Sequence, residues 1–163
     1  MAHTHTHAHD YAGDLEHDLA AAAQWCAARG EKLTEQRREV LALLLQAPGS
    51  MKAYDLLAEI QKQKPTAAPP TVYRALDFLV AAGLAHKLDS KNAFVACRDF
   101  EHPHHGVMLI CDSCHSVKEL SDERLEARLA EDAAQFGFSV AAQDIEVKGL
   151  CQDCRSTDQQ GKA

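Results

Sequence analysis

The sequence lacks any long apolar run, and this absence argues against two classes of protein. Apolar stretches such as Leu41–Leu45 are far shorter than the roughly 20 residues that a membrane-spanning helix needs. No segment resembles the apolar core of a secretory signal peptide. We therefore expect a cytoplasmic protein that does not bind a membrane.

The sequence also lacks the His-x-Glu motif that a zinc deaminase needs beside an open metal position. It nevertheless contains 10 histidines and six cysteines. Cytoplasmic thiols stay reduced, so six cysteines favour metal or redox chemistry over three disulfides. We expect a metal-binding protein that is not an enzyme and has no small organic substrate.

Positive charge is scarce overall, since the formal net charge is −7, but it is concentrated in one segment. Residues 1–31 carry one basic and five acidic side chains, and residues 96–163 carry seven basic and thirteen acidic ones. Only residues 32–95 are net positive, with nine basic and six acidic side chains. A basic segment between acidic ones indicates a DNA-facing element joined to a unit with another task.

The N-terminal segment Met1–His9 alternates histidine with small residues and shows no apolar period. We expect it to be disordered, and its four imidazoles to bind transition metals only weakly. The folded part is expected to begin near Asp14.

Four amphipathic helices are predicted next, because apolar residues recur at helical spacing. Thr34 suits the N-cap of the second helix, and Pro48-Gly49 ends it. The second proline of Pro69-Pro70 suits the first turn of the fourth helix, and Gly83 stops it. The predicted helices are approximately Asp14–Ala28, with Cys26 in the core, Glu35–Gln46, Ala53–Gln63 and Thr71–Ala82.

After Gly83 the apolar period changes to that of short strands. Leu84–Leu88 and Ala93–Cys97 flank the turn-rich tetrapeptide Asp89–Asn92, which predicts a β-hairpin, or wing. Helices followed by such a hairpin are typical of a winged helix-turn-helix. Thr71–Ala82 would then be the recognition helix in the DNA major groove.

A second unit is predicted after the histidine-rich segment Glu101–His105. We expect a helix capped by Ser121 that ends near Phe136, with Leu125, Leu129 and Ala133 facing inward. The predicted strands are Gly106–Ile110, Val117–Leu120, Ser139–Ala142 and Asp144–Lys148, and a polar tail follows from Arg155.

The strongest chemical signal is a pair of Cys-x-x-Cys motifs, Cys111/Cys114 and Cys151/Cys154. Two intervening residues let a turn aim both sulfurs at one ion, and two such turns complete the tetrahedral set that zinc accepts. A thioredoxin-like dithiol, which needs one pair only, and two disulfides are the competing interpretations. We predict one structural zinc ion that joins the two ends of the second unit.

A second set of possible ligands straddles the two units and their linker. A mixed site built from several segments exists only when those segments are docked, so its occupancy would set the angle between the units. The pattern therefore predicts a metal sensor. Its candidate ligands are His86, Cys97, His102, His104, His105 and Glu119.

The sequence resembles the ferric uptake regulator family over roughly residues 15–154. The matching segments are Leu33–Arg37, Ala53–Leu57, Pro69–Leu79, Ala82–His86 and Ile110–Cys114. The resemblance implies a homodimer that represses transcription at AT-rich palindromic operators in double-stranded DNA when its regulatory metal is bound. It also implies an α+β fold, with an N-terminal winged helix-turn-helix DNA-binding domain and a C-terminal α/β dimerisation domain. The expected boundaries are 1–13 for the histidine-rich terminus, 14–97 for the DNA-binding domain, 98–105 for the hinge, 106–155 for the dimerisation and metal-binding domain and 156–163 for the tail.

Within this family the sequence is most similar to the zinc uptake regulators, whose regulatory ligands map onto His86, Cys97, His104 and Glu119, with His105 as the alternative to His104. Iron sensors of the family carry a dense His-His-x-Asp-His run, whereas this chain has His104-His105-Gly-Val-Met and no aspartate there. A thiolate ligand such as Cys97 favours Zn²⁺ over Fe²⁺. We expect one regulatory zinc ion besides the structural one, with an iron or peroxide sensor as the alternative.

The resemblance also implies base contacts from Arg74 and further contact from Tyr54. An arginine on a groove-lying helix can bond bidentately to guanine. Phosphate contacts are expected from Thr71, Tyr73, Arg37 and Lys52. A zinc-storage protein is the alternative from another class, but it leaves the Pro69–Leu79 motif unexplained.

Overall fold

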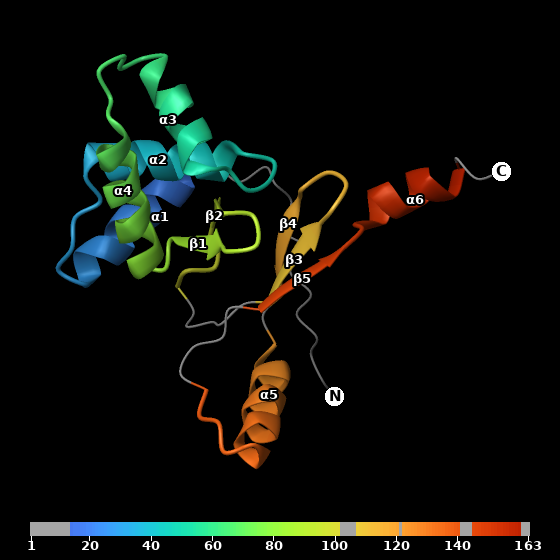
Figure 1. Cartoon of the computed structure of the whole chain (residues 1–163). Helices are drawn as coiled ribbons and strands as arrows, with labels where there is room; N and C mark the ends of the chain where they lie inside the picture. Colours follow the sequence, from blue (N-terminus) through green and yellow to red (C-terminus); the bar gives the residue numbers. More distant parts are fainter. Residues whose placement is uncertain (1–13, 102–106, 121, 141–144, 161–163) are drawn as a thin grey trace.

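The computed structural model describes residues 14–101, 107–120, 122–140 and 145–160, with the backbone alone described for 157–160. The helices are α1 (Leu15–Ala28), α2 (Glu35–Gln46), α3 (Ala53–Gln61), α4 (Pro69–Ala81), α5 (Glu123–Gln135) and α6 (Gln152–Gln160). The strands are β1 (Ala85–Leu88), β2 (Ala93–Ala96), β3 (Val107–Cys111), β4 (Val117–Leu120) and β5 (Ile145–Gly149). Figure 1 shows an N-terminal unit of α1–α4 with β1 and β2, and a C-terminal unit of β3–β5 with α5 and α6. Within these residues, every helix falls short of the length and hydrophobicity that a transbilayer segment requires.

Local sequence signals define the ends of the helices in the N-terminal unit. The Thr34 side chain accepts a hydrogen bond from the Arg37 amide at 3.5 Å, so the predicted N-cap of α2 is confirmed. Helix α4 begins at Pro69, two residues before the predicted start, because proline in the first turn needs no amide partner there. Gly83 follows this helix with a φ of 73°, which favours glycine.

The core of the N-terminal unit lies between its four helices and the hairpin. Leu56, Leu76 and Leu79 are fully buried, and Cys26 belongs to this core as predicted. The Trp25 indole Nε1 donates a hydrogen bond to the Ala82 carbonyl at 3.0 Å. This bond fixes α1 against the C-terminal end of α4, the helix predicted to read DNA.

The wing, residues 85–96, is an antiparallel hairpin in which His86 pairs with Val95. Asn92 adopts a φ of 47° in the connecting turn, a conformation that asparagine tolerates well. Met51 and Phe94 exchange backbone hydrogen bonds of 2.8 Å each, which tie the hairpin to the α2–α3 connection. The wing is thus fastened to the helical body.

The C-terminal sheet has the strand order β4-β3-β5, with β4 antiparallel and β5 parallel to β3. Residues directly opposite each other on adjacent strands face the same side of a sheet. Met108 pairs with Glu119 on one side and Glu146 on the other, so these three share the face turned to the wing. A small core cluster joins the two units and comprises Leu88 and Val95 from the wing with Met108, Ile110 and Val117 from the sheet.

Two predictions about α5 are wrong. Asp122 is its N-cap and accepts from the Arg124 amide at 2.9 Å, whereas the predicted cap Ser121 lies outside the described residues. Leu125 and Leu129 are 42 % and 38 % exposed, and none of the helix residues is buried. The apolar residues recur at helical spacing as predicted, but no part of the described chain packs over them. Figure 1 shows α5 projecting from the rest of the chain.

Two further predictions about the C-terminal unit need correction. The segment from Arg155 to Gln160, predicted to be a polar tail, belongs to helix α6, which begins at Gln152. Ser139 and Val140 do not form a strand, and the rest of that predicted strand, residues 141–142, lies outside the described residues. Polar composition alone does not distinguish a solvated helix from a loop, which explains the first error.

We expect Trp25→Phe to lower the free energy of unfolding by roughly 0.5–1.5 kcal/mol, the typical net contribution of one intramolecular hydrogen bond. The ring stays aromatic and the Nε1 donor to Ala82 is lost, but the smaller phenyl ring also loses part of the indole's contact with Arg29 and Phe100, so the hydrogen-bond contribution is the lower limit of the expected loss. Urea denaturation followed by circular dichroism measures the change. An unchanged midpoint would show that this bond does not stabilise the α1–α4 contact.

Candidate metal centres and nucleic-acid interface

The four cysteines of the two Cys-x-x-Cys motifs converge at one end of the sheet. Cys111 ends β3, Cys151 follows the parallel strand β5, and Cys154 lies in the first turn of α6. Their four sulfurs lie within 4.8 Å of one another, and the Cys114 and Cys151 sulfurs are 3.7 Å apart. All six cysteines of the chain are free thiols. The parallel pairing of β3 and β5 therefore builds a compact four-sulfur cluster, which can hold one tetrahedral ion.

The electrostatics of this cluster favour a bound cation. The Cys151 and Cys114 backbone amides donate to Cys111 and lower the pKa of its thiol to about 6. The Ser116 hydroxyl and amide lower the pKa of Cys114. A hydrogen bond with the Ser113 side chain lowers the pKa of the Cys154 thiol. The neighbouring thiols and burial outweigh it and raise this pKa to about 12. Four adjacent thiolates repel one another, so full ionisation requires a positive charge between them.

A second cluster joins the two units. His86 Nε2 on β1 lies 3.3 Å from one carboxylate oxygen of Glu119 on β4, and the Cys97 sulfur lies 3.9 Å from the other. The three ligand atoms fall within 4.8 Å of one another. The proposed fourth ligands, His104 and His105, and the further candidate His102 lie outside the described residues. The structure thus brings together three of the predicted ligands, two from the wing and its end and one from the sheet.

Cys97 is the most enclosed member of this second cluster, with only 1 % of its surface exposed. Burial, and then the negative charge of Glu119, raise the pKa of the Cys97 thiol well above its usual value. Only a deprotonated sulfur is a strong metal ligand, so metal binding here must displace a proton. Without a metal the Cys97 thiol therefore keeps its proton, and it becomes a strong ligand only when a metal displaces that proton.

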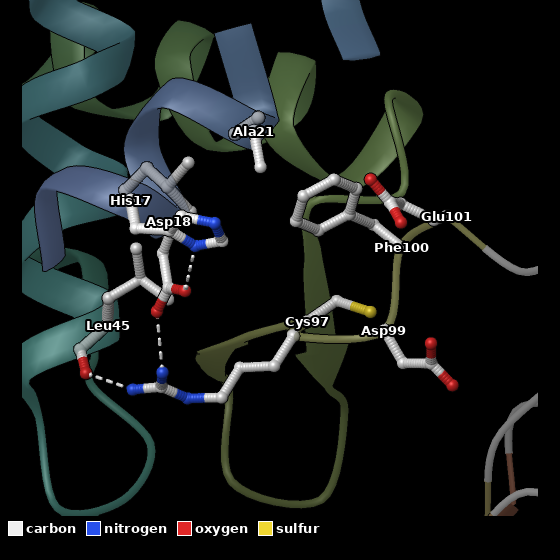
Figure 2. A pocket seen from close by; sticks show the side chains of 11 residues that line it. His17, Asp18, Ala21, Leu45, Cys97, Asp99, Phe100 and Glu101 are labelled. Carbon is white, nitrogen blue, oxygen red and sulfur yellow. Dashed lines mark hydrogen bonds and ion pairs between the residues drawn. The ribbon is translucent and has the colours of Figure 1, made fainter. Parts of the chain in front are cut away.

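Arg98 holds the exit of the wing in place, a role that the sequence did not reveal. Its guanidinium donates to Asp18 of α1 at 2.8 Å and to the Leu45 carbonyl at 2.7 Å, beside a cavity of about 150 Å³ (Figure 2). Cys97 lines the same cavity. The residue directly after the candidate metal ligand Cys97 is therefore anchored to the helical body. The only sequence signal was its position next to Cys97, because Asp18 lies far away in the chain.

The predicted DNA-contacting residues lie on α3, α4 and nearby segments. Tyr54 and Tyr73 are 77 % and 52 % exposed, and Arg74 and Lys52 are also exposed, whereas Thr71 is half-buried. Arg37 differs from the rest. Its guanidinium donates to the Lys32 carbonyl at 2.7 Å and lies 3.4 Å from the centre of the Phe78 ring. Arg37 therefore has intramolecular partners that would limit its reach toward a phosphate.

The model of the ferric uptake regulator family matches residues 28–148. The chain belongs to the ferric uptake regulator family. The zinc uptake regulation protein of Escherichia coli strain K12 is 46 % identical over 137 residues, which cover 83 % of this chain and 80 % of that protein.

Solved structures of this family share the fold. A zinc uptake regulator complexed with zinc and DNA superposes with a TM-score of 0.85 at 42 % identity, over 90 % of this chain and 99 % of that one. The holo form of XcZur superposes with a TM-score of 0.80 at 44 % identity, over 88 % and 99 % of the two chains. Its apo form reaches only 0.51 at 45 % identity, over 87 % and 98 %. The predicted α+β fold with a winged helix and a C-terminal α/β unit is confirmed.

We expect the two metal clusters to respond differently to loss of a thiol. Cys111→Ser should release the metal of the four-sulfur cluster and lower the melting temperature, because a structural ion contributes folding free energy directly. Each lost kcal/mol lowers the midpoint by roughly 2–4 °C in a protein of this size. Cys97→Ser should leave the four-sulfur metal in place, and its melting temperature should stay close to that of the wild type.

Differential scanning calorimetry and metal analysis of the purified variants measure these effects. Cys26→Ala is the matched control, since Cys26 is a buried thiol in the core of the N-terminal unit and belongs to neither cluster. Similar melting and metal content for Cys111→Ser and Cys97→Ser would contradict separate structural and regulatory ions.

Proposed function

We propose that this protein is a cytoplasmic, zinc-responsive transcriptional repressor that binds operator DNA as a homodimer when its regulatory zinc site is filled. One observation carries the proposal: His86, Cys97 and Glu119 come from two different units, yet their ligand atoms lie within 4.8 Å of one another. A metal at this place holds the wing of a DNA-binding unit against the C-terminal sheet. The regulated genes would be those of zinc uptake and homeostasis, as in the relatives named for zinc uptake.

The proposal assigns one structural and one regulatory zinc ion to each protomer. Cys111, Cys114, Cys151 and Cys154 would hold the structural ion, because a closed four-sulfur set leaves no open position for chemistry. His86, Cys97 and Glu119 would hold the regulatory ion, with His104 as the fourth ligand and His105 as the alternative. A site of this kind positions two protein units, so we propose no catalytic activity and no small organic substrate.

The donor atoms favour zinc in the regulatory site. Nitrogen, sulfur and oxygen ligands together suit the borderline Zn²⁺ ion, whereas iron sensing is better served by imidazole and carboxylate alone. The buried Cys97 thiol lies only 3.9 Å from a carboxylate oxygen of Glu119, and a divalent cation between them removes the repulsion that ionisation would cause. An iron or peroxide sensor of the same family is the second candidate, favoured only by the family membership.

The arrangement of the two units supports zinc-linked DNA binding. The holo and apo forms of XcZur have nearly the same sequence identity to this chain, so sequence divergence does not account for their different TM-scores. By this measure the present structure is more similar to the holo form and to the complex with zinc and DNA than to the apo form. We propose that zinc stabilises this arrangement, and by thermodynamic reciprocity operator DNA must then raise zinc affinity by the same factor.

The DNA interface would be built on α3 and α4. Arg74 is exposed on α4 and would contact base edges, with Tyr54 on α3 in a nearby position. Thr71, Tyr73 and Lys52 would contact phosphates, and Arg37 would do so only after leaving the Phe78 ring. A zinc-storage protein would need neither this surface nor the coupling of a metal cluster to the wing.

The homodimer is proposed from an uncovered apolar surface. Figure 1 shows α5 standing away from the rest of the chain. The sheet adds three exposed apolar residues, Leu109, Leu120 and Val147, which by register lie on the face opposite Met108. Surfaces of this kind mark protein interfaces. A two-fold symmetric dimer would read a palindromic operator, which the family resemblance suggests is AT-rich. The exposed apolar residues are Leu109, Leu120, Leu125, Leu129, Phe136, Phe138 and Val147.

The zinc response is tested by measuring operator affinity against free zinc for the wild type, Cys97→Ser and Glu119→Ala. We expect zinc to raise the affinity of the wild type by roughly 5- to 150-fold, the usual range of coupling between two sites. Both substitutions should abolish most of that increase while the dimer keeps its structural zinc. Cys26→Ser removes a thiol elsewhere and should keep the increase. Unchanged zinc dependence in both site variants would contradict the proposed sensor.

The DNA interface is tested by comparing Arg74→Ala with Lys52→Ala on operator and on random DNA. Arg74→Ala should weaken operator binding by about 1–3 kcal/mol and relax the base preference. Lys52→Ala should weaken both DNAs alike and reduce the salt dependence. Fluorescence anisotropy over a range of salt concentrations measures both effects. Equal losses on both DNAs for Arg74→Ala would assign that residue to phosphate contact.

A further inference from the structure

We propose that the β3–β4 turn, residues 112–116, is a second docking point for the DNA-binding unit, and that Gly49 is the positioning residue that makes this contact possible. The proposal rests on the proposed function, because the docked arrangement is taken as the DNA-binding one. It adds a contact that contains no regulatory zinc ligand. It also gives the turn between two structural zinc ligands a role in DNA binding.

The contact is between two backbones. A Cβ added to Gly49, in the α2–α3 connection, would lie 2.6 Å from the His115 carbonyl oxygen and 3.3 Å from the His115 carbonyl carbon. Ser116 Cα would be 3.6 Å away. The first distance is far below any van der Waals contact, so a side chain here forces one backbone to move. Figure 1 shows the α2–α3 connection beside the β3–β4 turn.

The β3–β4 turn cannot move easily. The His115 amide donates to the Cys111 carbonyl at 3.0 Å, and the Cys111 amide donates to the Ser116 carbonyl at 2.9 Å. The Asp112 amide donates to the Gly149 carbonyl of β5 at 2.8 Å. Cys111 and Cys114, proposed as structural zinc ligands, lie within or next to this hydrogen-bonded turn. A bound structural ion would fix the turn further.

The α2–α3 connection is held equally well on its own side. The Ala47 amide donates to the Leu43 carbonyl at 3.1 Å, and Met51 exchanges two backbone bonds of 2.8 Å with Phe94 of the wing. A cavity of about 350 Å³ beside the contact is lined by residues of both the connection and the turn. Two separate, internally braced surfaces therefore meet at Gly49.

The position of this contact links it to DNA binding. Helix α3 begins at Ala53, just after the connection, and carries the exposed Tyr54. The Met51–Phe94 bridge joins this connection to the wing, and the wing carries His86 of the regulatory cluster. The DNA-binding unit is thus held at two places, one near the wing and one near the start of α3. Two points of attachment define its orientation better than one.

Gly49→Ala tests this role selectively. Gly49 is absent from the glycines with positive φ among the described residues, so alanine is compatible with its local backbone. The clash arises only when the turn lies against it, so the substitution penalises the docked state and not the folding of either unit. Gly149→Ala is the matched control: it lies beside the same turn, has no positive φ, and its added Cβ would meet nothing within 4 Å.

We expect Gly49→Ala to weaken zinc-activated operator binding by roughly 5- to 150-fold, the range that corresponds to the usual penalty for overpacking. Its zinc-free DNA affinity, its structural zinc content and its dimerisation should match the wild type. Gly149→Ala should bind the operator as the wild type does. Anisotropy titrations with and without saturating zinc give the affinities, and metal analysis gives the zinc content.

The outcomes separate the two proposals. A wild type without any zinc-dependent operator binding would overturn the proposed function itself. A zinc-dependent wild type with Gly49→Ala indistinguishable from Gly149→Ala would overturn the docking role alone. A second measurement on the wild type needs no variant: with both metals bound, a nuclear Overhauser effect should connect the Gly49 and Ser116 α protons. Its absence would also overturn the docking role.

Discussion

The contact between the wing and the C-terminal sheet is the interaction on which the rest of this protein depends. At its centre the fully buried Leu88 lies against Met108, and the register of the sheet places Glu119 and Glu146 on either side of Met108. Glu119 reaches His86 and Cys97, while Glu146 accepts a hydrogen bond from the Ser90 amide at 3.3 Å. An apolar centre with a polar contact on each side gives a defined docking geometry with few residues.

This contact is well suited to control by a metal because its apolar part is small. Five side chains form the cluster between the units, which supplies limited hydrophobic free energy compared with the large core of the N-terminal unit. Burial beside Glu119 disfavours the Cys97 thiolate, so this sulfur becomes a metal ligand only at the cost of losing its proton. A metal bound there would offset that cost only when both units contribute their ligands. The proposed metal would therefore stabilise the docked arrangement selectively.

Two different constraints surround the same contact. The four-sulfur cluster joins the sheet to α6, and one of its members, Cys114, lies in the β3–β4 turn that contacts Gly49. Arg98 braces the opposite side, where it joins the end of the wing to Asp18 and Leu45. If the proposed regulatory cluster binds a metal, such bracing would let a small local change there act on the orientation of a whole unit.

Features that depend on neighbouring residues in the chain could be predicted from the amino-acid sequence. The N-cap at Thr34, the turn residues of the wing and the helical spacing of the core leucines are local, and all of them reappear in the structure. The Cys-x-x-Cys spacing was informative for the same reason, since each pair makes one turn. The apolar stripe of α5 was also read correctly as a pattern, but the sequence does not say whether the chain itself or a partner covers it.

The contacts between distant segments became visible in the tertiary structure and could not be predicted from the sequence. It brought Glu119 to His86 and Cys97, joined Arg98 to Asp18 and placed Gly49 against His115. None of these pairs has a periodic signal, because each depends on how two folded units dock and not on local backbone preference. The helical tail at α6 was missed for a related reason: its first turn is held by Cys154 at the four-sulfur cluster, and a polar composition gives no sign of such an anchor.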